Sequence, residues 1–214
     1  MHGTTAPHPV TPQATILPGA MMPGAADEAN HRMANHLKLL AALVAVEARG
    51  VSDPKGLAAL ERTQQRIAAI GGVHRHLYAG GTDEVDLGDY LETLGEQLSR
   101  SCGHHRRVLV DAETVPVTGA TASSIGILAT ELVTNACKHA YAAGEAGEIR
   151  VELRRRPGGM CRFTVEDRGH GTRTRTGRNG LGTRLIDATV AKLGAVARWE
   201  DARPGTRFCM DVRF

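Results

Sequence analysis

One stretch of the chain carries side chains that could bind both a metal ion and a polyphosphate. Residues 131–139 read Glu-Leu-Val-Thr-Asn-Ala-Cys-Lys-His. In a helix, the polar residues at i, i+4, i+7 and i+8 of this stretch share one face: Glu131, Asn135, Lys138 and His139. Carboxylate and amide oxygens suit Mg²⁺, and a lysine ammonium suits phosphate oxygens. The alternative is an amphipathic helix with an incidental polar pair, and the stretch alone favours neither interpretation.

Two glycine-rich stretches follow, each beside residues that could contact a ligand. Asp167 ends an alternating apolar run and is followed by Arg168-Gly169-His170-Gly171, which permits close backbone approach to a ligand. Gly180-Leu181-Gly182 leads into an apolar helical pattern, and a glycine-rich turn at a helix N-terminus is a ready anion site. Thr206 follows Gly205 near the last predicted strand. Glycines mark ordinary turns more often than ligand sites, so the order of these motifs is the stronger signal.

These side chains need a scaffold, and the hydrophobic periodicity predicts its elements. Apolar residues at helical spacing predict helices over 87–100, 121–141 and 181–193. Alternating apolar residues predict strands over 107–111, 149–154, 161–166, 195–199 and 206–212. Antiparallel runs of strands with helices on one face predict an α+β two-layer sandwich over residues 84–214.

The N-terminal part predicts a helical hairpin over residues 26–80. Apolar residues recur at helical spacing over 33–44, and Asp53 followed by Pro54 is typical of the start of a second helix. A lone hairpin buries too little surface to be stable, so we expect it to form a dimeric four-helix bundle or to lean on the next domain. Residues 1–25 are expected to be a disordered tail, because they are rich in proline and lack a sustained period.

The composition narrows the classes of function. The net charge is +3, from 26 basic and 23 acidic residues, which is too balanced to indicate a nucleic-acid partner. No apolar run approaches the ~18 residues of a membrane span, and no signal peptide is evident, so we expect a cytoplasmic protein without membrane insertion. The four cysteines are dispersed without a C-x-x-C motif, which predicts reduced core thiols: Cys102, Cys137, Cys161 and Cys209.

The order of these motifs resembles the ATP-binding domain of the GHKL superfamily, the Bergerat fold shared by histidine kinases and DNA gyrase. The resemblance makes residues 131–139 the N-box, in which Asn135 would bind Mg²⁺ and Glu131 would assist the metal or the reacting groups. It implies ATP as the nucleotide, with Asp167 accepting a hydrogen bond from the adenine amino group.

The same resemblance gives roles to the glycines. Gly169 and Gly171 would shape the adenine pocket, and Gly180 and Gly182 would present backbone N–H groups to the phosphates. Residues 168–180 would form a short, arginine-rich ATP lid.

The hairpin resembles the phosphoacceptor region of the HWE-related branch of sensor histidine kinases. The motif Glu28-Ala29-Asn30-His31-Arg32-Met33-Ala34-Asn35-His36-Leu37 implies that His31 accepts the phosphoryl group, and Glu28, one turn earlier, is our candidate to orient or deprotonate it. Two features depart from the branch. Ala34 stands where a lysine is usual, and Thr130 rather than histidine precedes Glu131, which places the chain beside the strict HWE group.

We therefore expect a histidine kinase core that autophosphorylates His31 from Mg-ATP and phosphorylates a response-regulator receiver domain. The resemblance also implies a homodimer through residues 26–80, with input from a separate sensor protein or from the rest of a longer kinase. One alternative is a phosphotransfer relay with a degenerate ATP domain. Another is an anti-sigma-factor serine kinase, which would not need His31 or the hairpin.

Overall fold

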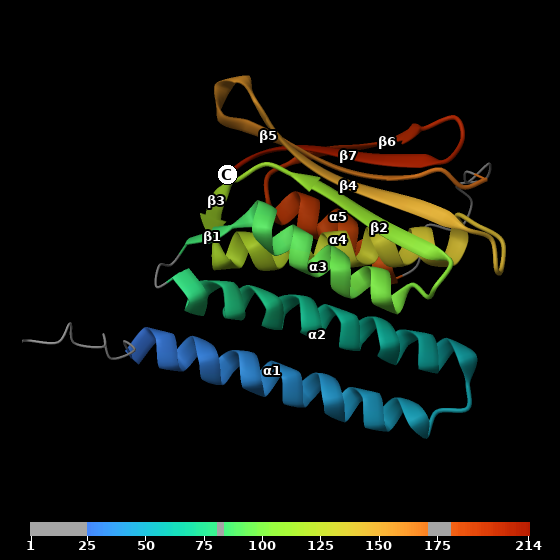
Figure 1. Ribbon diagram of the computed structural model, residues 1–214, viewed down its shortest axis with the longest axis horizontal. Coiled ribbons are helices and arrows are strands. Elements are labelled where there is room, and N and C mark those ends of the chain that lie inside the picture. The colour runs from blue at the N-terminus through green and yellow to red at the C-terminus, as the bar shows by residue number, and fades with distance from the viewer. Residues whose placement is uncertain (1–24, 81–83, 171–180) are drawn as a thin grey trace, which may run out of the picture.

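The periodic segments fold into stacked layers, with the helical hairpin on one side and a sheet on the other (Figure 1). The computed structural model describes residues 25–80, 84–170 and 181–214. Its helices are α1 Ala25–Arg49, α2 Pro54–Gly80, α3 Leu87–Ser101, α4 Gly119–His139 and α5 Leu181–Lys192, with a short 3-10 turn over Pro157–Gly159. Its strands are β1 Glu84–Asp86, β2 Arg106–Ala112, β3 Pro116–Thr118, β4 Gly147–Arg156, β5 Met160–Asp167, β6 Val196–Asp201 and β7 Thr206–Arg213.

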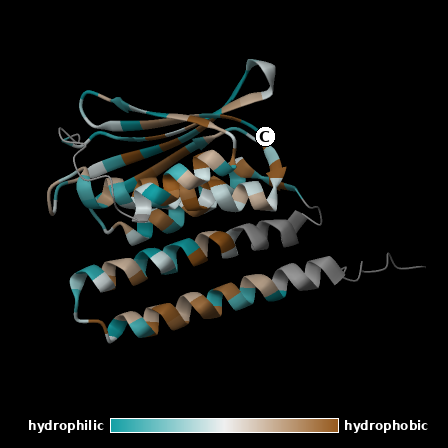
Figure 2. Ribbon diagram, turned by 180° about the vertical axis from the view of Figure 1, so that it is seen from behind, coloured by the Kyte–Doolittle hydropathy of each residue, from teal (hydrophilic) through white to brown (hydrophobic). Residues whose placement is uncertain are grey.

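The hairpin of α1 and α2 leans on the rest of the chain through α2, and α1 is the outermost element (Figure 1). Asp53 caps α2, because its Oδ2 accepts a hydrogen bond of 2.8 Å from the backbone N–H of Gly56. Ala34 is only 2% exposed, so the position that departs from the family motif is packed rather than solvated. Several large apolar side chains of α1 remain exposed: Met33, Leu39, Leu40, Leu43 and Val46. Figure 2 shows the hydrophobic residues along α1 in brown.

The sheet beyond the helices has the strand order β2-β4-β5-β7-β6. The predicted α+β architecture, a helical N-terminal region followed by a sandwich of helices on a sheet, is confirmed. The expectation of antiparallel strands holds for β4, β5, β7 and β6, but β2 pairs parallel to β4. The reason is that α4 lies between β2 and β4 in the chain, and such a crossover returns the strand in the same direction. The paired three-residue strands β1 and β3 were not predicted, because they are too short to show a period.

The hydrophobic core lies between the inner face of the sheet and helices α3, α4 and α5. Alternate residues of the central strands point into it, for example Ile149, Phe163 and Phe208, each at most 1% exposed. Tyr90 of α3 fits under Gly126 of α4, where a Cβ would lie 1.9 Å from the tyrosine hydroxyl oxygen. Glycine at that position therefore sets how closely α3 and α4 approach.

The outer face of the sheet carries many charged side chains, and none of the described helices covers it (Figure 1). Its arginines pair with acids across the strands. Arg162 and Arg198 both donate to Asp211, at 2.7 and 3.0 Å, and Arg207 donates to Glu166 at 2.6 Å. This pairing is consistent with a solvated, salt-bridged surface. Among the described residues, no helix has the length and apolarity that crossing a lipid bilayer requires.

Candidate functional site

Helix α4 positions the polar stripe that the sequence singles out. Thr118 caps its N-terminus by accepting a hydrogen bond from the N–H of Thr121, and its apolar residues face the core. The four members of the stripe differ in burial, which decreases along the helix. Glu131 is 1% exposed, Asn135 is half-buried, and Lys138 and His139 are exposed in the last turn, where positive charge complements the helix dipole.

Glu131 is held by a residue that sequence reasoning missed. Arg66 of α2 donates from Nε to Glu131 Oε1 at 2.6 Å. The other carboxylate oxygen, Oε2, is buried and has no hydrogen-bond partner among the described residues. No sequence signal distinguishes Arg66 from other arginines on a helix surface, because the contact depends on how α2 packs on α4.

The first turn of α5 closes over the same carboxylate. A Cβ built on Gly182 would lie 2.7 Å from Glu131 Oε2 and 4.0 Å from Asn135 Nδ2. Glu131, Asn135 and Gly182 are therefore brought together, and a side chain at position 182 would require the Glu131 carboxylate to shift. The unpaired oxygen therefore lies near an amide side chain and the first turn of a helix.

Asp167 lies at the end of β5 in a cradle of backbone. The side chain is 8% exposed, and its Oδ1 accepts hydrogen bonds from the N–H groups of Gly169, at 3.0 Å, and Thr206, at 3.3 Å. Gly205 has a φ of 102°, and a Cβ there would lie 1.9 Å from the Asp167 carbonyl oxygen. Burial raises the pKa of Asp167 above its ordinary value, while the two backbone N–H groups act in the opposite direction.

The Asp167 loop rests on the C-terminal end of α4. His170 donates its N–H to the carbonyl of Ala140 at 2.8 Å, and a Cβ on Gly169 would lie 1.9 Å from the same oxygen. Tyr141 accepts from the N–H of Arg168 at 3.0 Å through its hydroxyl oxygen. The loop that follows Asp167 therefore packs against the C-terminal end of α4, the helix that carries the polar stripe.

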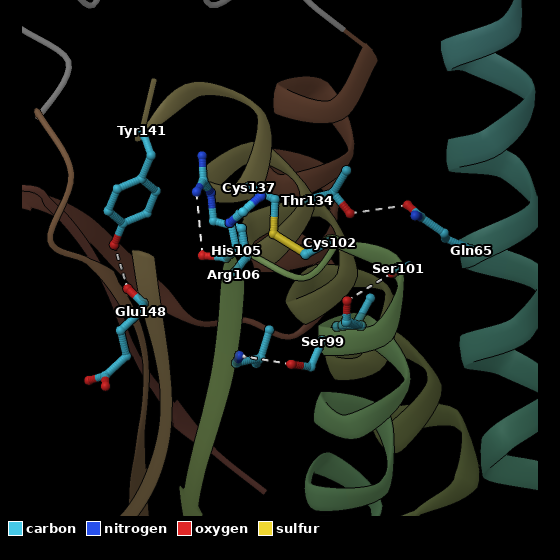
Figure 3. The surroundings of a disulfide bond; sticks show 12 residues. Gln65, Ser99, Ser101, Cys102, His105, Arg106, Thr134, Cys137, Tyr141 and Glu148 are labelled. Atoms are coloured by element: carbon cyan, nitrogen blue, oxygen red, sulfur yellow. Dashed lines mark hydrogen bonds between the residues drawn. A yellow bond between two sulfur atoms is a disulfide. The ribbon is translucent and has the colours of Figure 1, made fainter. Parts of the chain in front are cut away.

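The prediction of four reduced thiols is wrong for two of them. Cys102, directly after α3, and Cys137, in the last turn of α4, form a disulfide with Cα atoms 5.8 Å apart (Figure 3). The two cysteines are 35 residues apart in sequence, and the packing of α3 against α4 brings them together, so their spacing carried no signal. Cys161 and Cys209 are buried and free, as expected.

Several predicted site residues are not placed in full. The backbones of Glu28 and His31 belong to α1 and that of Leu181 to α5, but their side chains lie outside the described residues, as do Gly171 and Gly180 altogether. The predicted lid over 168–180 is therefore described only in its first residues.

On the hairpin, the backbone of His31 lies far from the point where Arg66 contacts Glu131. Gly71 of α2 faces Leu37 of α1, because a Cβ on Gly71 would lie 3.4 Å from the Leu37 Cβ. Counted from this pair in an antiparallel hairpin, the backbone of His31 and that of Arg66 lie about 16 Å apart along the axis, at 1.5 Å per residue. In Figure 1 helix α2 lies between α1, which carries His31, and α4, which carries Glu131, so the observed arrangement separates these two residues.

The donor set suits a magnesium ion that is held mainly by a substrate. Mg²⁺ in phosphate sites takes one or two protein oxygens and completes its shell with phosphate oxygens and water. The unpaired Oε2 of Glu131 and the side-chain amide of Asn135 fit that requirement. Within the described ranges no group of three or more histidine, cysteine or acidic residues could hold a metal by itself.

Comparison with known proteins finds a family match for both the helical hairpin and the sheet-containing part of the chain. A family model described as histidine kinase matches residues 28–102, and one described as histidine kinase-like ATPase domain matches residues 106–206. The histidine kinase domain of the Erythrobacter litoralis EL346 blue-light activated histidine kinase has a similar structure. Its TM-score is 0.68 at 25% sequence identity, over 87% of this chain and 91% of that one.

Two curated relatives are similar in sequence. Blue-light-activated histidine kinase 2 of Erythrobacter litoralis is 28% identical over 195 residues, which are 86% of this chain and 56% of the relative. Sensor histidine kinase PdtaS of Mycobacterium tuberculosis is 26% identical over 131 residues, 60% of this chain and 26% of the relative. The chain thus spans about half the length of the first relative and about a quarter of the second.

Proposed function

The chain belongs to the histidine kinase family, and from this premise we propose that it transfers the γ-phosphoryl group of ATP to His31 and then to an aspartate on a response-regulator receiver domain. The site around α4 would bind the nucleotide with Mg²⁺, and the hairpin would carry the phosphoryl group between the two reactions. Neutral imidazole is a nucleophile near pH 7, which suits His31 to both steps.

The observation that carries this proposal concerns Oε2 of Glu131, which is buried beside Asn135 and Gly182 and has no hydrogen-bond partner among the described residues. A buried carboxylate oxygen without a partner lowers stability, so its presence favours a site that is completed by a ligand. When bound, Mg²⁺ would neutralise charge on the polyphosphate. Glu131 and Asn135 are the residues that would hold it.

Other residues of the site would bind and orient the nucleotide. The Asp167 carboxylate would accept a hydrogen bond from the adenine amino group, while the backbone N–H groups of Gly169 and Thr206 hold the carboxylate in place. Gly182, at the start of α5, would offer a backbone N–H and the positive end of the helix dipole to the phosphates. Lys138 and His139 are exposed at the end of α4 and would add positive charge near the same phosphates.

We also propose the domain division and the assembly. Residues 26–80 would form the dimerisation and phosphotransfer hairpin, and residues 84–214 the ATP-binding domain. The exposed apolar face of α1 supports a homodimer, because side chains such as Leu39, at 59% exposure, and Val46, at 58%, would be buried by a second hairpin. Sedimentation of the purified chain would test this. The use of ATP favours a cytoplasmic location, and a separate sensor protein or further domains would supply the signal.

Incubation with γ-labelled ATP and Mg²⁺ tests the function most directly. We expect acid-labile label on the wild type and none on His31→Ala or Asn135→Ala, followed by transfer of the label to a receiver domain. Mg²⁺-dependent nucleotide binding should survive in His31→Ala and be lost in Asn135→Ala, which separates the acceptor from the metal–nucleotide site.

The same experiment addresses both alternatives. A relay with a degenerate ATP domain would show neither nucleotide binding nor label. An anti-sigma-factor serine kinase would bind nucleotide but leave His31 unlabelled.

A further inference from the structure

Arg66 reaches from the hairpin into the nucleotide site, although α2 otherwise packs outside the ATP-binding domain. Its side chain is 16% exposed and forms an ion pair of 2.6 Å with Glu131, which is 1% exposed. The neighbouring Gln65 accepts a hydrogen bond of 3.1 Å from Thr134, one turn further along α4 (Figure 3). Two successive residues of α2 therefore contact the helix that carries the polar stripe.

The two oxygens of the Glu131 carboxylate have different surroundings. Oε1 is engaged by Arg66, whereas Oε2 is the unpaired oxygen next to Gly182 and Asn135. A single hydrogen bond from Arg66 Nε holds Oε1 on the side of α2, while Nη2 of the guanidinium is buried without a partner among the described residues. Oε2 lies beside Gly182, on the side where the nucleotide would bind.

We propose that Arg66 is a positioning residue for Glu131: by holding Oε1, it presents Oε2 to the metal-binding side of the nucleotide site, so that docking of the hairpin sets the affinity for the metal–nucleotide complex. This inference rests on the proposed function. It assigns no contact between Arg66 and the nucleotide itself. Because Arg66 belongs to the hairpin, a shift of α2 by one helical turn, about 5.4 Å, would remove it from Glu131. A signal that moves the hairpin would thereby reach the metal site.

Binding of a fluorescent ATP analogue, titrated with Mg²⁺ and repeated in EDTA, tests the role of Arg66. In Arg66→Met we expect the half-saturating Mg²⁺ concentration to rise about 10- to 100-fold, the usual effect of losing a residue that orients a metal ligand. Binding in EDTA should stay within about twofold of wild type, because adenine recognition at Asp167 is untouched. For Arg66→Lys the half-saturating Mg²⁺ concentration should lie between those of the wild type and Arg66→Met, since lysine keeps the charge without the guanidinium geometry.

Gln65→Met is the matched control. It removes the adjacent contact between α2 and α4 but leaves Glu131 and its partner intact, so its Mg²⁺ response should equal that of the wild type. Combining Arg66→Met with Glu131→Gln should weaken the Mg²⁺ response no further than Glu131→Gln alone, since Arg66 acts through that carboxylate.

Three results would overturn the proposal. An unchanged Mg²⁺ response in Arg66→Met would show that Glu131 needs no positioning. Equal losses with and without Mg²⁺ would indicate a purely structural role, and a lower half-saturating concentration would mean that Arg66 competes with the metal.

If the wild type bound no nucleotide at any Mg²⁺ concentration, the proposed function itself would fail. Metal-dependent binding that is insensitive to Arg66 would leave the proposed function standing and remove only this inference.

Discussion

Asp167 shows how a residue can be suited to binding at a cost to stability. Its carboxylate sits in a cradle that glycines keep open, and burial raises its pKa above the ordinary value of 3.8. A raised folded-state pKa means that the folded protein loses stability as pH rises from the unfolded value through the folded one. Ionisation of Asp167 at neutral pH therefore opposes folding, which is consistent with a group kept for a ligand.

Asp167→Asn is expected to weaken nucleotide binding by about 10- to 100-fold, the loss of one charged hydrogen bond to adenine. Its unfolding midpoint at pH 7 should match or exceed that of the wild type, since the penalty for ionisation is gone. Wild-type binding should also weaken as pH falls through the raised pKa. Calorimetric titration with nucleotide at several pH values measures the affinity and its pH dependence, with Glu166→Gln as the neighbouring control. Retained affinity in Asp167→Asn would remove this residue from the adenine site.

Asp211, on the outer face of the sheet, shows the opposite behaviour. Hydrogen bonds from Arg162 lower its pKa from 3.8 to about 2, with Arg198 contributing as well. A lowered folded-state pKa stabilises the fold at pH values above the unfolded pKa, and the contribution is lost as pH falls from about 4 to about 2.

Asp211→Asn should lower the free energy of unfolding by about 1–2 kcal/mol at pH 7, because each pKa unit corresponds to about 1.4 kcal/mol and partial exposure screens the pair. Urea denaturation at several pH values should show the difference from wild type closing between about pH 4 and pH 2. A constant difference across that range would mean that charge is not its cause.

At the scale of elements, the last turn of α4 is anchored on several sides. The disulfide joins it to the end of α3. Ala140 and Tyr141, directly after the helix, accept hydrogen bonds from the backbone of the segment that follows Asp167. In Figure 3 the disulfide lies between the Thr134–Gln65 contact and the Tyr141–Glu148 contact. The helix end that carries Asn135 is thus held between the hairpin and the sheet.

Removing the disulfide should destabilise the folded state. Closing a loop between residues 35 apart contributes about 4 kcal/mol in the chain-entropy model, which is an upper value for Cys102→Ser. Thermal unfolding of the wild type with and without a reducing agent provides the control, since reduction should lower the wild-type midpoint and leave that of Cys102→Ser unchanged. Equal midpoints for all samples would show that the bond adds no stability.

At the scale of the whole molecule, the hairpin is docked with its histidine away from the site. The contacts of Arg66 and Gln65 hold α2 on α4, while the backbone of His31 lies further along the hairpin, on the outer helix α1. In-line transfer requires the imidazole to reach the terminal phosphate, so the hairpin must move relative to its own ATP-binding domain, or receive the phosphoryl group from a second copy.

A disulfide engineered between α2 and α4 tests this requirement. Gln65→Cys with Thr134→Cys replaces two side chains already in contact and should trap the docked arrangement when oxidised. At concentrations where the chain is monomeric, we expect the oxidised double variant to bind nucleotide but to lose His31 labelling, and to regain it on reduction. Wild type treated in the same way controls for the native disulfide. Full labelling of the trapped form would show that the docked state is itself competent.

The sequence alone determined the motifs and the elements that carry them. The i, i+4 spacing of Glu131 and Asn135, the glycines after Asp167 and before α5, and the periods of the helices and strands depend on neighbours along the chain, which a sequence displays directly. Only the tertiary structure decided which distant residues meet. The pairing of Arg66 with Glu131, the Cys102–Cys137 disulfide, the parallel direction of β2 and the separation of His31 from Glu131 all arise from packing between elements far apart in sequence. Local periodicity says which face of an element is apolar, but the element that covers that face depends on shape and volume across the whole core.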